Sequence, residues 1–123
     1  MLRLMVWSMK QQISHGKYFL FENPPTSALW QCEELCSILN HRDVRAGIGH
    51  ACAFGSVGLD GYTPIWKQYK WVSNSQTILA ALCKPCPGHA SHVSVSGRHT
   101  KHSGIYSIDL ARAVASAVLQ LGR

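Results

Sequence analysis

Residues 18–30 read YFLFENPPTSALW, and this stretch decides how the chain is organised. Its aromatic and aliphatic beginning is typical of a buried strand, but the run ends abruptly in Glu-Asn-Pro-Pro. Proline has no backbone N–H to donate, so two in succession stop a strand ladder. We therefore expect a strand at residues 18–22, with Glu22 at its end, where a chain can hold a functional group over a cleft.

Helical patterns flank this strand on both sides. Apolar residues at helical spacing predict a helix over residues 2–14, which Gly16 ends as a C-cap. After the prolines, Thr26 or Ser27 can cap a second helix that reaches Leu39. The order helix, strand, helix indicates an α/β fold.

The rest of the chain continues this alternation, with turn residues between the periodic segments. The expected segments are a polar connection at 40–49, a strand at 51–55, a loop at 56–64, a strand at 69–73, a helix at 76–82, irregular structure at 83–104 and a helix at 108–121.

Composition favours a folded, basic chain. With 123 residues it has room for one domain, residues 1–123, or is a fragment of a larger domain. Hydrophobic residues make up 46% of the chain, more than disordered chains contain. Lys and Arg outnumber Asp and Glu by 12 to 6, which suits a polyanion such as nucleic acid. The alternative is a soluble basic protein without such a partner.

The cysteine count and the first residues indicate an intracellular, reduced protein, nuclear or cytoplasmic. Five cysteines is an odd number, and Arg3 and Lys10 interrupt the opening MLRLMVWSMK too often for a signal peptide. No apolar stretch reaches the length of a membrane span, so no membrane partner is expected.

The segment CKPCPGHASH offers two thiols and two imidazoles, a ligand set that satisfies tetrahedral zinc. These ligands follow one another at intervals of three: Cys83, Cys86, His89 and His92. Because they are closer together than in common zinc fingers, the alternative is a loop with adventitious thiols and solvent-facing histidines. In a zinc site, His99 or His102 could replace one of the close pair.

Aromatic and basic residues suggest a nucleic-acid contact, since aromatic rings stack on bases and cations neutralise phosphates. The candidates are Lys67, Lys70, Trp71 and Arg98, with Trp30 and Trp66 beside them. The alternative places these tryptophans in the core or in a subunit contact.

Five landmarks occur in a fixed order: GKYFLFENPPTSALW, CAFG, YKWVSNS, CPGHASH and IYSIDLARAVASAV. In this order they resemble the later part of DNA (cytosine-5) methyltransferase-like proteins, with phage and retroelement-associated versions closest, over roughly residues 16–119. The resemblance implies a partial Rossmann-like sheet with flanking helices and an irregular Cys/His-rich segment. It also implies S-adenosylmethionine as cofactor and DNA as partner.

The resemblance gives Glu22 a catalytic and base-binding role and Asn23 a supporting role in base binding. Glu22 would hold the target cytosine by its ring N3 and exocyclic amine. A carboxylic acid in a poorly solvated pocket can share a proton, which stabilises the ring after a thiolate attacks C6. The base must leave the stack to reach such a pocket. Without the resemblance, Glu22 is a strand-end carboxylate satisfied by neighbouring amides.

The sequence departs from the family's pattern before Glu22. Only 21 residues precede it, which leaves no room for the Gly-rich cofactor loop, and every cysteine follows it. Pro85-Cys86 therefore matches the residues of the catalytic Pro-Cys loop but follows Glu22 instead of preceding it. The glycines of residues 47–49 lack the strand-loop-helix context of a cofactor loop.

These absences lead to two hypotheses. The first is an incomplete methyltransferase-like domain, inactive alone, that self-associates or needs a missing upstream half. The second is a small basic nucleic-acid-binding or zinc-stabilised interaction module.

Overall fold

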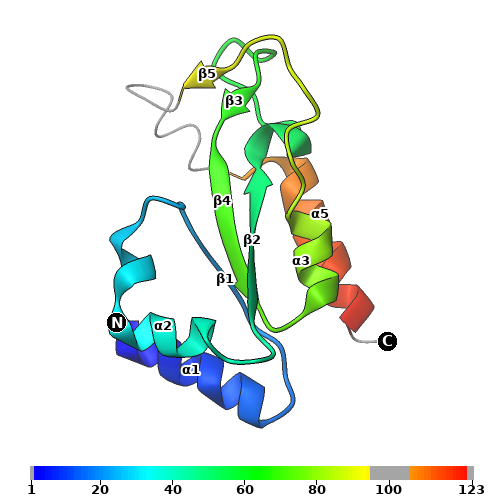
Figure 1. Ribbon diagram of the computed structural model, residues 1–123. Helices are drawn as coiled ribbons and strands as arrows, with labels where there is room; N and C mark the ends of the chain where they lie inside the picture. The colour runs from blue at the N-terminus through cyan, green and yellow to red at the C-terminus, as the bar shows by residue number, and fades with distance from the viewer. Residues whose placement is uncertain (1, 95–105, 122–123) are drawn as a thin grey trace.

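The computed structural model describes residues 2–94 and 106–121 (Figure 1). The helices are α1 (Leu2–Ser14), α2 (Glu33–Leu39), α3 (Gln76–Leu82) and α5 (Ile108–Leu121), with 3-10 turns η1 (Ala28–Gln31) and η2 (Ala51–Phe54). The strands are β1 (Leu20–Asn23), β2 (Arg45–His50), β3 (Ile65–Trp66), β4 (Gln68–Ser73) and β5 (Val93–Ser94).

The main sheet has three antiparallel strands in the order β1-β4-β2, and the short strands β3 and β5 pair in parallel. Successive side chains of the central strand β4 point to opposite faces. Tyr69 and Trp71 belong to a core with α3 and α5, whereas Val72 belongs to a second core with α1 and α2. The fold is therefore three layers deep, with helices on both sides of the sheet (Figure 1).

The Pro-Pro stretch after β1 folds into a turn that packs against the second core. Ser27 caps η1, because its side chain accepts from the amide of Leu29 (3.3 Å). The indole N–H of Trp30 donates to the carbonyl of Pro24 (2.7 Å), and its ring packs edge-to-face on Phe21. Burial of this indole under α1 and α2 turns the chain sharply out of the sheet after β1.

Helix α3 packs directly against β2. Gly49 makes this possible, since a Cβ on it would overlap the carbonyl of Leu82 near the end of α3. Ser75 is the N-cap of this helix, and its side chain accepts from the amide of Ile78 (3.2 Å). The glycines that sequence reasoning excluded as a cofactor loop thus lie in a strand, where they allow close packing.

The mixture of helices and strands agrees with the expected α/β class, and the helices expected at 2–14, 76–82 and 108–121 are confirmed. The strand expected at 51–55 is wrong, because this segment forms η2 and the preceding segment, β2, pairs with β4. The second helix is interrupted, with η1 and α2 separated at Cys32.

Two further expectations concern the sheet and the membrane. Rossmann-like sheets are built from parallel strands, whereas both pairings of this three-stranded sheet are antiparallel, so the sheet gives the Rossmann-like part of the prediction no support. Within the described ranges, none of the helices has both the length and the apolar character that crossing a bilayer requires.

Candidate metal centre

The first residue of the candidate centre is Cys52, which lies in η2 directly after β2. The amide of Ala51 donates to the carbonyl of Lys67 (2.9 Å), which fixes the start of the turn. Gly55 ends the turn with a φ of 75°, a conformation that glycine adopts without steric cost. Cys52 is 7% exposed and its thiol lies near that of Cys86.

The other three residues of the centre lie on the loop 83–92, which connects α3 to β5. The amide of His50, at the end of β2, donates to the carbonyl of Lys84 (2.9 Å) and fastens the start of the loop. Gly88 has a φ of 102°, which residues with a Cβ rarely adopt, and its amide donates to Sγ of Cys86 (3.4 Å). The loop therefore doubles back toward η2.

Four potential ligand atoms converge at this point, each within 4.8 Å of the others. They belong to Cys52, Cys86, His89 and His92. Sγ of Cys86 and Nε2 of His92 are 3.5 Å apart. Zinc binds sulfur at about 2.3 Å and nitrogen at about 2.0 Å, so tetrahedral geometry also places such a pair about 3.5 Å apart. Both the donor types and this spacing fit zinc.

The two thiols differ in their electrostatics. Burial raises the pKa of Cys52 to about 11, and the hydrogen bond and charge of Cys86 add to the increase. Backbone N–H groups of Gly88 and His89 donate to Sγ of Cys86 and hold the pKa of that thiol below its usual value. Cys86 therefore loses its proton more readily than Cys52, whose proton a bound cation would have to displace.

Aromatic packing orients the histidines. The ring of Trp66 lies edge-to-face between His50 and His92, with centroid distances of 5.1 and 5.2 Å. The rings of His89 and His92 are 5.4 Å apart. The Gln68 amide is 3.4 Å from Nε2 of His50, and Nδ1 of His50 is buried without a partner in the described part of the chain. These contacts restrict how the imidazole of His92 can turn.

Cys83 lies outside this cluster. It caps the C-terminus of α3 and its Sγ packs against Gly47 of β2. Burial raises the pKa of this thiol. In the set predicted from sequence, the structure thus replaces Cys83 by Cys52, while Cys86, His89 and His92 stay. The predicted alternatives His99 and His102 lie outside the described residues.

Cys52 was not predicted as a ligand, because the prediction used the spacing of neighbouring Cys and His residues. Cys52 sits in the apolar run ACAF, which carries no zinc-binding pattern of its own. The available signal was the crowding of residues 83–92, which required one ligand from elsewhere. In the structure that ligand is Cys52, which β3 and β4 separate from the loop in the sequence.

Glu22 and Asn23 end β1 at one edge of the sheet. Glu22 pairs with Trp71 in the register, and its Oε1 accepts a hydrogen bond from the hydroxyl of Tyr106 (2.8 Å). Burial and this carboxylate raise the pKa of Tyr106. Burial, with a smaller contribution from the charge of Glu22, raises the pKa of Tyr69 to about 12. The sequence-based alternative placed amides around Glu22, but the bond seen here comes from a phenol.

The nucleic-acid contact predicted from sequence consists of Lys67, Lys70, Trp71 and Arg98, and the structure places the two lysines over opposite cores. Trp71 is only 2% exposed, so its ring cannot stack on a base. Nζ of Lys70 lies 4.5 Å from the centre of the Trp30 ring, whereas Nζ of Lys67 lies 5.4 Å from that of Tyr69, in the opposite core. Arg98 lies outside the described residues.

Comparison with known proteins identifies no relative. No protein-family model, no curated protein and no solved structure matches the chain. Proposals about function therefore rest on the chemistry of the sites themselves.

Proposed function

We propose that this chain is a zinc-stabilised interaction module, in which a structural zinc ion fastens the end of the sheet to the loop 83–92. The observation that carries the proposal is the convergence of four ligand atoms from two distant segments. Cys52 comes from η2, and Cys86, His89 and His92 come from the loop. An ion at this point would join the loop to the main sheet, because η2 continues directly from β2.

Ligand chemistry supports zinc over the hard cations. Calcium and magnesium prefer oxygen ligands, whereas two thiolates and two imidazoles suit zinc. Four protein ligands complete a tetrahedral shell and leave no position for a reacting water, which is the arrangement of structural rather than catalytic zinc. The two thiolates also balance the two charges of the ion.

Zinc content and thermal unfolding test this proposal. We expect chain purified without chelator to carry zinc by elemental mass spectrometry, and a strong chelator to lower its Tm. Cys52→Ser should lose the metal, whereas Cys83→Ser, the same chemical change outside the cluster, should keep it. A chain that contains no zinc and whose Tm does not change with chelator would overturn the proposal. If Cys83→Ser lost the zinc and Cys52→Ser kept it, the ligand set predicted from sequence would be the correct one.

The DNA cytosine methyltransferase-like fragment, with a partial Rossmann-like sheet, is the second candidate. The position of Glu22 favours it, since this half-buried carboxylate near the end of β1 accepts a hydrogen bond from Tyr106, which is 41% exposed. Tyr69 and Trp71 are 5.6 Å apart between ring centroids, and Tyr106 packs on both. Under this hypothesis, S-adenosylmethionine and the catalytic thiol belong to a missing upstream half, and the chain is inactive alone.

Base preference tests this second candidate. Fluorescence anisotropy can compare a labelled thymine oligonucleotide with one that carries a single cytosine. A methyltransferase-like site predicts tighter binding of the cytosine strand, which Glu22→Gln abolishes and Glu33→Gln, at an exposed glutamate of α2, preserves. Equal binding of the two strands would contradict a base-binding role of Glu22.

A further inference from the structure

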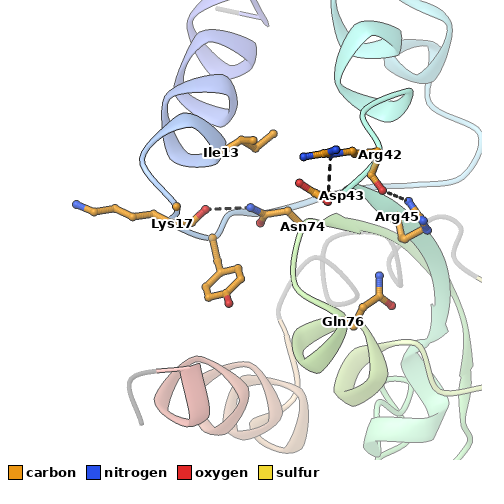
Figure 2. Close-up of a pocket in the computed structure, with 9 residues that line it drawn as sticks. Ile13, Lys17, Arg42, Asp43, Arg45, Asn74 and Gln76 are labelled. Atoms are coloured by element: carbon orange, nitrogen blue, oxygen red, sulfur yellow. Dashed lines mark hydrogen bonds and ion pairs between the residues drawn. The ribbon is translucent and has the colours of Figure 1, made fainter.

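A basic surface lies at the start of β2, the opposite end of this strand from the metal cluster. Two hollows of about 430 Å³ and about 590 Å³ share Arg42 and Arg45 in their lining. The first lies where the end of α1, the turn before β2 and the start of α3 meet, with Lys17 at its rim (Figure 2). The second also includes Lys70.

We propose that these two hollows form one site for the phosphate backbone of a single-stranded nucleic acid. The site does not depend on the zinc proposal, because none of the four metal ligands lines either hollow. It also differs from the contact predicted from sequence, since Lys70 lines the second hollow whereas Lys67 and Trp71 line neither.

Charge supports a polyanionic partner. Among the residues that the structure describes, Lys17, Arg42, Arg45 and Lys70 line the hollows with a single carboxylate, Asp43. The surface therefore carries three net positive charges, half of the formal +6 of the whole chain. Such a concentration raises the local potential and attracts phosphates.

Arg45 is positioned to donate to a phosphate. Its Nη1 donates to the carbonyls of Arg42 (2.6 Å) and Val44 (2.9 Å), which fixes the plane of the guanidinium. Its Nε and Nη2 have no acceptor among the residues that the structure describes. A guanidinium held in this way loses little rotational freedom when it binds a phosphate.

Arg42 is available in a different way. Its Nε lies 4.0 Å from a carboxylate oxygen of Asp43, and the Arg42 side chain is 92% exposed. An exposed ion pair of this kind contributes little to stability, so a phosphate can take the place of the carboxylate at small cost.

The shape and lining favour a nucleic acid over a membrane surface. A flat lipid surface does not enter a hollow, whereas the ridge of a phosphate backbone can. Amide side chains, Asn40, Asn74 and Gln76, stand beside the cations. Tyr18 lines the first hollow and is 48% exposed, so its ring is accessible to an unpaired base. This aromatic ring is what favours a single strand over a duplex.

Fluorescence anisotropy with a labelled 20-nucleotide single strand tests the proposal on the full chain. Binding should weaken steeply between 50 and 200 mM salt. We expect Arg42→Gln/Arg45→Gln to lower the affinity at least tenfold at low salt and to reduce the salt slope by about 1 to 2. The matched control Lys10→Gln/Lys84→Gln removes the same charge elsewhere and should change affinity less than twofold. Tyr18→Ala should weaken the single strand more than the duplex.

The single variant Arg42→Gln keeps the test decisive if Arg45 proves necessary for folding. It alters a side chain that is almost fully exposed, so a folded protein is expected, with affinity lowered at least threefold. Equal losses in the two double variants would show that only net charge matters and would overturn the site. Tighter binding to phosphatidylserine vesicles than to the single strand would overturn the choice of partner.

Discussion

Two glycines of β2 determine how closely α3 approaches the sheet. A Cβ at Gly49 would overlap the backbone carbonyl of Leu82 and lie 3.1 Å from Nε1 of Trp71. A Cβ at Gly47 would instead overlap Sγ of Cys83, the end of a side chain. A carbonyl can move only if α3 moves with it, whereas a thiol can rotate. The two positions should therefore respond differently to the same added methyl group.

We predict that Gly49→Ala destabilises the chain by about 2 to 3 kcal/mol, the upper part of the range for overpacked cores, and that Gly47→Ala costs less. Removing the Cys83 thiol should relieve the overlap at residue 47. The double variant Gly47→Ala/Cys83→Ala should therefore lose less stability than the sum of the losses in its two single variants. Urea unfolding measures these differences. An additive double variant, or a Gly49→Ala protein as stable as the parent, would show that α3 can shift freely.

Tyr69 predicts how stability depends on alkaline pH. Burial raises its pKa from 10.0 to about 12, so the unfolded chain releases this proton at a lower pH than the folded chain. Its contribution is complete below pH 10 and is lost as the pH rises toward 12, by at most about 3 kcal/mol. Tyr69→Phe should flatten the decline relative to the parent in urea unfolding at successive pH values. The control Tyr62→Phe, at a side chain 78% exposed, should leave the slope unchanged.

At the scale of elements, serine caps determine where the helices of the first core begin. Oγ of Ser107 accepts from the amide of Leu110 (3.1 Å) and donates to the carbonyl of Phe54 (2.6 Å). This side chain both starts α5 and attaches it to η2, the turn that carries Cys52. A cap with two partners should matter more than a serine within a helix.

Ser107→Ala should therefore destabilise the chain by about 1 to 2 kcal/mol, as loss of an N-cap does. Ser8→Ala provides the control, since Oγ of Ser8 donates to the carbonyl of Leu4 on the exposed side of α1. Alanine has the higher helix propensity there, so this change should be neutral or slightly stabilising. Thermal unfolding by circular dichroism compares the two, and equal effects would contradict the capping role of Ser107.

Elements with local signals were predictable from the sequence, whereas those determined by pairing were not. Helix α5 has its cap and its apolar spacing within one segment, and both of its ends were predicted. The apolar run 51–55 is compatible with either a strand or a turn. The pairing of the preceding strand β2 with β4 decides that it forms the turn η2. The candidate site follows the same rule. Three ligands share the loop 83–92, but Cys52 reaches it only through the tertiary fold.

At the scale of the whole molecule, the proposed zinc site and the packed cores lie in different regions. The core around Val72 lies under α1 and α2, on the face of the sheet opposite α3 and α5. The cluster joins η2 to the loop 83–92, beyond the end of β2. The amide of Val93, which donates to the carbonyl of Pro64 (2.8 Å), belongs to the small β3–β5 sheet next to that loop. Removing the ion should therefore loosen one end of the molecule and leave the other end folded.

Hydrogen exchange can measure this difference residue by residue. With chelator, the amides of His50 and Val93 should lose protection, because the first bonds to Lys84 on the ligand-bearing loop and the second to Pro64, which lines a hollow with Cys52 and His89. The amides of Phe21 and Val72, which pair within the sheet, should keep their protection within a few fold. Cys52→Ser should reproduce the pattern without chelator, and Cys83→Ser should not. Equal loss of protection at all four amides would mean that the metal stabilises the entire fold. Unchanged protection at His50 would mean that the metal does not stabilise the end of β2.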